Sequence, residues 1–187
     1  MCENWWNDIA EMSGLNPRAE KEARFTSRLV VQQMTASMSD LIVASILVVE
    51  DSDEDFDTLL EAVGAADVKR LIHRAASGGD CLAMLRGEVE VQLPLLPALI
   101  LMDLNSHGVD GRDALVTIKT DAILKKIPVV VLTASASPKD VAFCYQAGAN
   151  AYHVKPVRHD HHLLLLRSLL NYWLDSAMLP PILVKVD

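Results

Sequence analysis

Residues 99–103 read LILMD, four apolar side chains followed directly by an acid. The pattern recurs three more times, with a different kind of polar residue after each apolar run. The other stretches are ILVVED at residues 46–51, VVVLT at residues 129–133 and YHVKP at residues 152–156. Unbroken apolar runs of this length are typical of parallel strands covered on both faces. Because ligands bind beyond the carboxyl ends of such strands, these polar residues are expected to meet at one edge of a sheet.

The segments between these runs show helical spacing. After Ser52, a helix-capping residue, apolar side chains repeat at helical intervals at Phe56, Leu59, Leu60 and Val63, and Gly64 is expected to end that helix. Further helices are expected near residues 80–85, 112–119, 137–148 and 160–173, and residues 68–75 are expected to form a strand at the sheet edge. Strands that alternate with helices predict a doubly wound α/β fold.

Composition excludes several classes of protein. At 187 residues the chain is long enough for one well-buried domain, and it has no apolar stretch of the roughly 18–20 residues that span a bilayer. The net charge of −8 argues against a nucleic-acid partner. Three widely spaced cysteines, Cys2, Cys81 and Cys144, argue against a disulfide framework. With no secretory signal at the N-terminus, a cytoplasmic location is expected.

The pattern of the sequence changes near residue 42. Residues 1–42 show no strand pattern and are expected to be an N-terminal extension, either a real arm or the product of a mis-called start, since Met34 and Met38 offer later ones. The main domain is expected to cover residues 43–180, and a C-terminal tail residues 181–187.

The polar residues that follow the four apolar runs together predict phosphoryl-transfer chemistry. The carboxylate of Asp103 can attack phosphorus and become an acyl phosphate, a reaction that depends on positioning and charge neutralisation. Mg²⁺ prefers oxygen ligands, which Glu50, Asp51, Asp103 and the backbone carbonyl of Asn105 can provide. The ammonium of Lys155 and the hydroxyl of Thr133 can each pair with a phosphate oxygen.

From about residue 45 to residue 175, the chain resembles the receiver domain of two-component response regulators. The matching residues are Glu50, Asp51, Asp103, Thr133, Lys155 and Pro156. The resemblance implies a five-stranded parallel sheet of order 2-1-3-4-5 with five helices. It also implies that Asp103 accepts a phosphoryl group from a histidine kinase, that Asp51 and Asp103 bind Mg²⁺ directly, and that Glu50 acts through water. Two further implications are a cis bond between Lys155 and Pro156 and a switch in which Tyr152 turns inward when Thr133 moves.

A narrower resemblance is to the single-domain receivers that serve phytochrome-type histidine kinases. It rests on DLN at residues 103–105, DGR at residues 110–112, IPVVVLT at residues 127–133 and YWLD at residues 172–175, followed by Leu179 and Pro180. One departure is Ser106-His107-Gly108, where the family commonly has a proline four residues after the acceptor. The rigidity of this loop and the lifetime of the phosphate are therefore open.

The last predicted helix carries more apolar surface than one sheet face can cover. Its apolar residues are Leu163, Leu165, Leu166, Leu169, Leu170, Tyr172, Trp173 and Leu174. They spread over roughly 200° of the circumference, whereas covering a sheet needs a stripe nearer 100°. The excess predicts a homodimer through this helix and the last strand.

The expected function is a phosphorylation switch that signals through protein contacts and is not an enzyme. A phosphatase with an aspartyl nucleophile would have a second acid at position 105, where this chain has asparagine, and no glycine-rich dinucleotide loop follows the first strand. The remaining alternative is a pseudo-receiver, a constitutive interaction module that never carries phosphate. A metal site at His159, His161 and His162 is disfavoured, because no cysteine or acidic cluster completes it.

Overall fold

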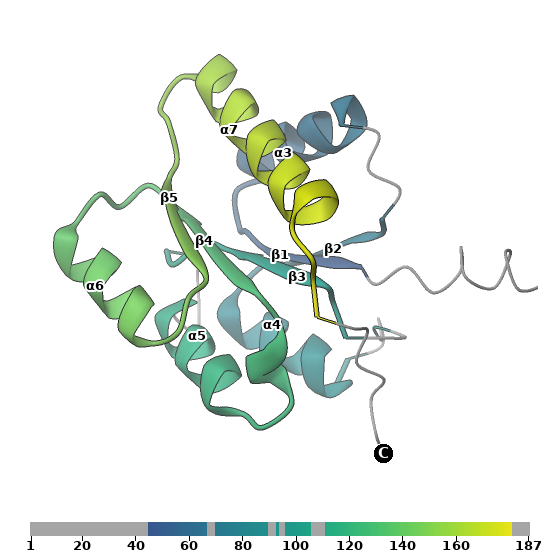
Figure 1. Ribbon diagram of the computed structural model, residues 1–187, viewed down its shortest axis with the longest axis vertical. Coiled ribbons are helices and arrows are strands. Elements are labelled where there is room, and N and C mark those ends of the chain that lie inside the picture. The colour runs from purple at the N-terminus through teal and green to yellow at the C-terminus, as the bar shows by residue number, and fades with distance from the viewer. Residues whose placement is uncertain (1–44, 67–69, 90–92, 94–95, 106–110, 181–187) are drawn as a thin grey trace, which may run out of the picture. The chain divides into compact units, whose positions relative to one another are not determined.

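The computed structural model describes residues 45–66, 70–89, 93, 96–105 and 111–180 (Figure 1). The predicted extension at residues 1–42, the tail at residues 181–187 and the loop at residues 106–110 lie outside these ranges.

The described strands form one parallel sheet of order β2-β1-β3-β4-β5, which confirms the predicted fold class and strand order. The strands are β1 (Ile46–Val49), β2 (Ile72–Ala75), β3 (Leu99–Met102), β4 (Val129–Thr133) and β5 (Ala151–Val154). The edge position predicted for residues 68–75 is confirmed for β2.

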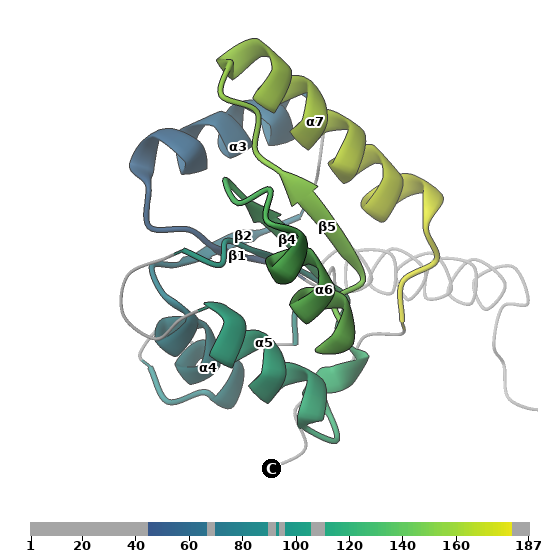
Figure 2. The same ribbon diagram turned by 90° about the vertical axis from the view of Figure 1, so that its left-hand side faces the viewer.

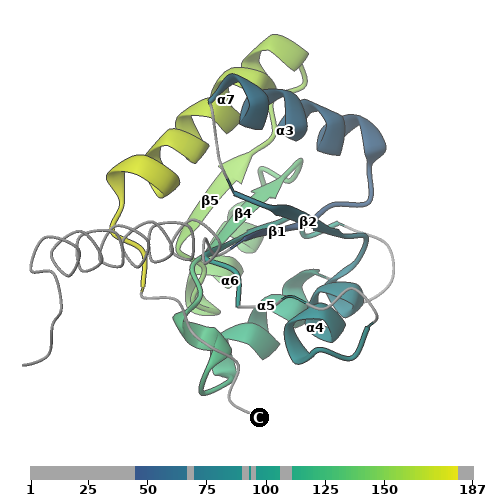
Figure 3. The same ribbon diagram turned by 90° about the vertical axis from the view of Figure 1, so that its right-hand side faces the viewer.

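Helices cover both faces of the sheet. They are α3 (Asp53–Ala65), α4 (Gly78–Arg86), α5 (Gly111–Thr120), α6 (Pro138–Gln146) and α7 (His159–Asn171), with a 3₁₀ turn η1 (Leu124–Lys126) and a π-helical turn η2 (Tyr172–Ser176). Figures 1, 2 and 3 show α3 and α7 on one face and α4, α5 and α6 on the other. None of these helices is long and apolar enough to cross a bilayer.

The central strands are buried on both faces, as their unbroken apolar runs predict. In β1, Ile46 and Val48 pack under α3 and α7, whereas Leu47 and Val49 pack under the helices of the opposite face. The same alternation holds in β3 and β4, because successive side chains of a strand point to opposite faces. Burial on both faces fixes the register that brings the strand ends level.

Two helix ends differ from the sequence-based expectation. Helix α3 does not end at Gly64 but continues to Ala65, and the amide of Ala66 closes its last turn on the carbonyl groups of Ala62 and Val63. A left-handed glycine is therefore not needed there. Helix α6 ends at Gln146, and the left-handed residue that follows is Gly148, with φ of 96°.

The apolar excess on α7 is smaller than its sequence predicts. Leu163, Leu165, Trp173 and Leu174 are partly buried against the core, because η2 continues the helix along the sheet. Leu164 and Tyr172 remain 58% exposed each. A groove lined by Ala151, His153, Leu165, Tyr172 and Trp173 separates the end of α7 from β5. Tyr172, which lines this groove, therefore leaves apolar surface uncovered beside β5.

Candidate functional site

The sheet brings the ends of β1, β3, β4 and β5 to one edge. Val49 pairs with Met102, and the amide of Asp103 donates to the carbonyl of Val49 at 2.9 Å, so Glu50 and Asp103 leave neighbouring strands at the same level. The amide of Lys155 likewise donates to the carbonyl of Thr133 at 2.8 Å. The sequence-predicted convergence of these residues therefore follows from strand register.

Lys155 lies at the centre of the site. Its Nζ donates to Glu50 Oε2 at 2.6 Å, to Asp55 Oδ2 at 2.8 Å and to Asp103 Oδ2 at 2.8 Å. The side chains of Lys155 and Glu50 are 7% and 6% exposed, and that of Asp103 is 10% exposed. One buried ammonium therefore holds three carboxylates that would otherwise repel one another.

Burial and pairing act in opposite directions on these groups. Burial alone would lower the pKa of Lys155, but hydrogen bonds to Asp103, Asp55 and Glu50 outweigh it and raise the pKa above its usual value. The pKa of Glu50 is raised by burial, and its bond to Lys155 offsets only part of that effect. Lys155 is thus a permanent cation, whereas Glu50 takes up a proton more readily than an ordinary glutamate.

The predicted cis bond between Lys155 and Pro156 is wrong, since no cis peptide bond occurs in the described part of the chain. The trans isomer is the lower in energy at X–Pro bonds. Lys155 reaches its three carboxylates from the trans backbone, so the cis isomer is not needed to direct it inward.

Asn105 links Asp103 to Thr133. Its backbone N–H donates to Asp103 Oδ1 at 3.0 Å, and its side-chain Nδ2 donates to Thr133 Oγ1 at 3.1 Å. Thr133 is fully buried. Its hydroxyl is therefore held by an amide group and does not contact Asp103 in the described hydrogen-bond network.

Tyr152 contacts the loop after β4 and not Thr133 itself. Its hydroxyl donates to the carbonyl of Ser135 at 2.9 Å. Ser135 Oγ donates to Asp140 Oδ2, and Arg112 donates to Asp140 Oδ1 at 2.9 Å. The bond from Ser135, followed by that from Arg112, lowers the pKa of Asp140. This network ties the start of α5 to the β4–α6 loop and was not predicted from the sequence.

Arg74 on β2 supports the acidic loop after β1, also without a prediction from the sequence. Its Nε donates to the carbonyl of Glu50 at 2.8 Å and its NH2 to the carbonyl of Asp51 at 2.9 Å. The guanidinium also lies 4.8 Å from the centre of the Phe56 ring. Asp51, the third of the predicted acids, is partly exposed at this position.

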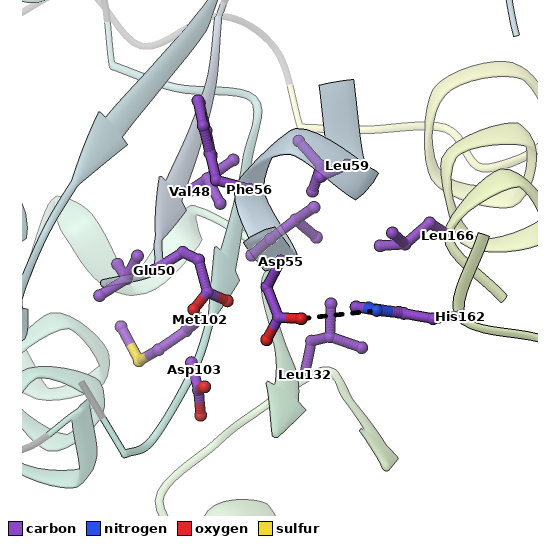
Figure 4. Close-up of a pocket in the computed structure, with 12 residues that line it drawn as sticks. Val48, Glu50, Asp55, Phe56, Leu59, Met102, Asp103, Leu132, His162 and Leu166 are labelled. Atoms are coloured by element: carbon purple, nitrogen blue, oxygen red, sulfur yellow. Dashed lines mark ion pairs between the residues drawn. The ribbon is translucent and has the colours of Figure 1, made fainter. Parts of the chain in front are cut away.

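Asp55 and His162 complete the inner wall of the site (Figure 4). Asp55 lies one helical turn after Asp51, where an acid can equally be explained as a favourable charge at a helix N-terminus. His162 is buried and faces Asp55, whereas the side chain of His159 is 61% exposed and faces Glu61. The three histidines therefore do not converge on a common point.

The donor set fits a hard divalent cation, because it consists of carboxylate and carbonyl oxygens. Glu50 and Asp103 are the two buried carboxylates at adjacent strand ends, with Asp51 beside them. Within the described ranges, no group of three or more acidic, histidine or cysteine side chains is arranged to hold a metal ion. One oxygen of Glu50 and one of Asp103 accept from Lys155, so a bound cation would share these two carboxylates with the ammonium.

Comparison with known proteins identifies the family. Residues 46–167 match the model of the response regulator receiver domain. The chain belongs to the response regulator receiver family. Receiver domains are signalling phosphoacceptors that bind a divalent metal ion and are not generally classed as enzymes.

Three matches to two relatives, Rcp1 and RcpA, are informative. Response regulator Rcp1 of Synechocystis sp. is 33% identical over 135 residues, which cover 72% of this chain and 92% of Rcp1. The crystal structure of the phosphorylated cyanobacterial phytochrome response regulator RcpA is 34% identical, with a TM-score of 0.70, and covers 74% of this receiver and 99% of RcpA. The crystal structure of the Mn²⁺-bound form of Rcp1 also has a TM-score of 0.70, at 33% identity, and covers 74% of this receiver and all of Rcp1.

Proposed function

We propose that this receiver accepts a phosphoryl group on Asp103 from a histidine kinase and transmits the change through protein contacts. The observation that carries the proposal is the buried ammonium of Lys155, 2.8 Å from Asp103 and 2.6 Å from Glu50. RcpA is a phytochrome response regulator, and other solved relatives are a response regulator in red-light signalling and a bacteriophytochrome response regulator, which favours a phytochrome-type kinase as the donor.

In the proposed reaction, a carboxylate oxygen of Asp103 forms a bond to phosphorus as the bond to the phosphohistidine nitrogen breaks. The electron pair of that bond stays with the imidazole of the kinase. Lys155 pairs with an oxygen of the transferred group, and the Thr133 hydroxyl donates to another after leaving Asn105. Glu50, Asp51, Asp103 and the Asn105 carbonyl would hold Mg²⁺, which supplies positive charge for the phosphoryl oxygens.

The proposed switch uses the contacts around the β4–α6 loop. In the structure the Thr133 hydroxyl accepts from Asn105, and Tyr152 bonds to the carbonyl of Ser135. Movement of Thr133 toward the phosphoryl group would displace Ser135. The hydrogen bonds of Ser135 to Tyr152 and Asp140 would then change. The phosphorylated group then favours one of two arrangements of this loop, which changes the face seen by partners.

We also propose that residues 43–180 form the receiver and that it forms a homodimer through α7 and β5. Two observations support the dimer. Leu164 and Tyr172 are more than half exposed, and β5 pairs with β4 alone among the described strands. An unpaired strand edge beside exposed apolar side chains is a favourable surface for a second copy of the chain.

Incubation with Mg²⁺ and a small phosphodonor, read by intact mass, tests the phosphoacceptor. The wild-type chain should gain one phosphate, Asp103→Asn should gain none, and Asp113→Asn, an exposed acid on α5, should behave as wild type. If all three stay unmodified, the constitutive pseudo-receiver is correct. Ser106-His107-Gly108, the stretch that departs from the family pattern, lies outside the described residues, and the family assignment does not support the pseudo-receiver.

A further inference from the structure

The proposed reaction leaves one buried titratable group of the site without a role. His162 lies in the first turn of α7 and is 5% exposed. Its Nδ1 is 3.8 Å from Asp55 Oδ1, and its Nε2 has no hydrogen-bond partner among the described residues (Figure 4). A buried polar atom of this kind requires an explanation, because nearly all such atoms in folded proteins are paired.

Asp55 stands between His162 and Lys155. Its Oδ2 accepts from Lys155 Nζ at 2.8 Å, while its Oδ1 faces the imidazole. With 32% of its side chain exposed, Asp55 is the most accessible of the three carboxylates on Lys155. It is therefore the partner that Lys155 can release at the lowest desolvation cost.

Lys155 has three N–H donors, and all three are used. A phosphoryl oxygen on Asp103 can pair with Lys155 only if one present acceptor gives way. Releasing Glu50 would leave a buried carboxylate without its cation, whereas releasing Asp55 leaves a carboxylate that already faces an imidazole. The geometry therefore favours Asp55 as the group that Lys155 gives up.

Several charged groups act on His162. Asp55 faces it from α3, Lys155 lies beyond Asp55 at the start of the β5–α7 segment, and His159 lies one turn earlier on α7. Glu50 and Asp103 line the same small cavity from the strand ends. Burial lowers the pKa of His162 most, Lys155 and His159 lower it further, and Asp55 raises it. The net shift is downward, so the imidazole is neutral near pH 7.

We propose that phosphorylation of Asp103 is coupled to the uptake of one proton by His162, with Asp55 as the positioning residue that connects them. This inference rests on the proposed function. When Lys155 turns to the phosphoryl group, the Asp55 carboxylate loses its cation. The imidazole takes one proton from solvent water and pairs with that carboxylate as an imidazolium.

The coupling is reciprocal, as any thermodynamic linkage must be. If phosphorylation raises the proton affinity of His162, then a lower pH favours the phosphorylated state. For a single coupled proton, the affinity for a phosphoryl group changes at most about tenfold per pH unit between the two pKa values of the imidazole. At saturating Mg²⁺, a mildly acidic solution would therefore favour the phosphorylated state over the unphosphorylated one.

The test uses the full chain with Mg²⁺ and beryllofluoride, a tetrahedral phosphoryl analogue. The imidazole resonances of His162, assigned with His162→Gln, are followed by NMR from pH 5 to pH 9, with Mg²⁺ alone and with Mg²⁺ plus beryllofluoride. The expected result is that bound beryllofluoride raises the pKa of His162 by about one pH unit or more, as a newly unpaired carboxylate at this distance does.

Variants separate this coupling from a structural role. At saturating Mg²⁺, the beryllofluoride affinity of the wild type relative to that of His162→Gln or Asp55→Asn should increase on acidification. His161→Gln, a change at the exposed neighbour, should keep the wild-type pH profile. Should His162→Gln fail to fold, Asp55→Asn alone still tests the profile.

The outcomes also distinguish this inference from the proposed function. A ¹⁹F signal of bound beryllofluoride that is lost in Asp103→Asn, together with an unchanged titration of His162, would overturn the coupling and leave the phosphoacceptor role intact. Failure of beryllofluoride to bind at all would overturn both.

Discussion

At the scale of single residues, the Lys155 ammonium balances the charge of Glu50, Asp55 and Asp103. Lys155→Met should reduce the free energy of unfolding by about 3 kcal/mol at pH 7, because it leaves buried carboxylates without their cation. Mg²⁺ should recover more stability in this variant than in the wild type, since the ion can neutralise the same oxygens. Urea denaturation with and without Mg²⁺ measures both effects.

Lys125→Met, at an exposed lysine of η1, is the matched control and should change stability by less than about 0.5 kcal/mol. Because the pKa of Lys155 is raised, its contribution to stability persists up to the ordinary lysine value of 10.5 and is lost only as pH rises beyond it. Equal destabilisation by the two substitutions would contradict the role assigned to Lys155.

Glu50 should make cation binding sensitive to pH. Its pKa is raised by burial, so it takes up a proton at a higher pH than the ordinary glutamate value of 4.5. Mg²⁺ affinity should therefore fall as pH decreases from 7 to 5, and Glu50→Gln should bind about tenfold more weakly at pH 7 with a smaller dependence on pH. Titration calorimetry at both pH values measures this, and an unchanged pH dependence in Glu50→Gln would exclude Glu50 as its source.

Protonation of Glu50 has opposite effects on cation binding and on folding: it weakens the cation site but stabilises the folded state. Ionising a buried carboxyl group opposes folding, so the contribution of this group to stability is present below pH 4.5 and is lost as pH rises through its raised pKa. Acidification thus weakens the cation site before it weakens this part of the fold.

The sequence predicts the site residues at strand ends better than those on helices. Asp103, Thr133 and Lys155 are placed by strand register, which the apolar runs indicate directly. Asp55 and His162 depend on which way helical side chains point after α3 and α7 pack together. A single sequence does not specify that packing, so the sequence assigns no role to Asp55 and considers His162 only as part of a disfavoured metal site.

At the scale of helices and strands, Gly111 sets the approach of α5 to the acceptor strand. A Cβ atom at this position would lie 2.5 Å from the carbonyl oxygen of Asp103 and 2.9 Å from Leu104 Cα. Gly111→Ala should therefore destabilise the protein by about 1–3 kcal/mol, because backbone atoms must move apart. It should also slow phosphorylation, because Asp103 itself is displaced.

Gly64→Ala is the matched control on α3, where nothing lies within 4 Å of the added methyl group. This substitution should stabilise the protein by about 0.5–1 kcal/mol through helix propensity. Thermal unfolding and phosphorylation rates of both variants provide the comparison, and equal effects on stability would show that the close contact at Gly111 is unimportant.

The sequence predicts the type of each helix and strand more accurately than the residue at which it ends. Within the described ranges, the strands of the sheet and the helices that cover it lie where apolar periodicity places them. The end of α3 was mispredicted because Gly64 adopts ordinary helical geometry and does not act as a cap. The Lys155–Pro156 isomer was mispredicted because the resemblance to the family implies a cis bond. In this chain the Lys155 side chain contacts Asp103 with that bond in the trans form.

At the scale of the whole molecule, the uncovered surface beside β5 predicts self-association. Tyr172 is 58% exposed and packs edge to face against Trp173, with ring centroids 5.3 Å apart. Tyr172→Glu should shift the chain toward monomer by introducing a charge into this apolar surface. Equilibrium sedimentation, with and without phosphorylation, measures the change.

Leu71→Glu, at a residue 65% exposed beside the opposite edge strand β2, is the control and should sediment as wild type does. A wild-type chain that is monomeric in both states would refute the dimer, and equal effects of the two substitutions would place the interface elsewhere.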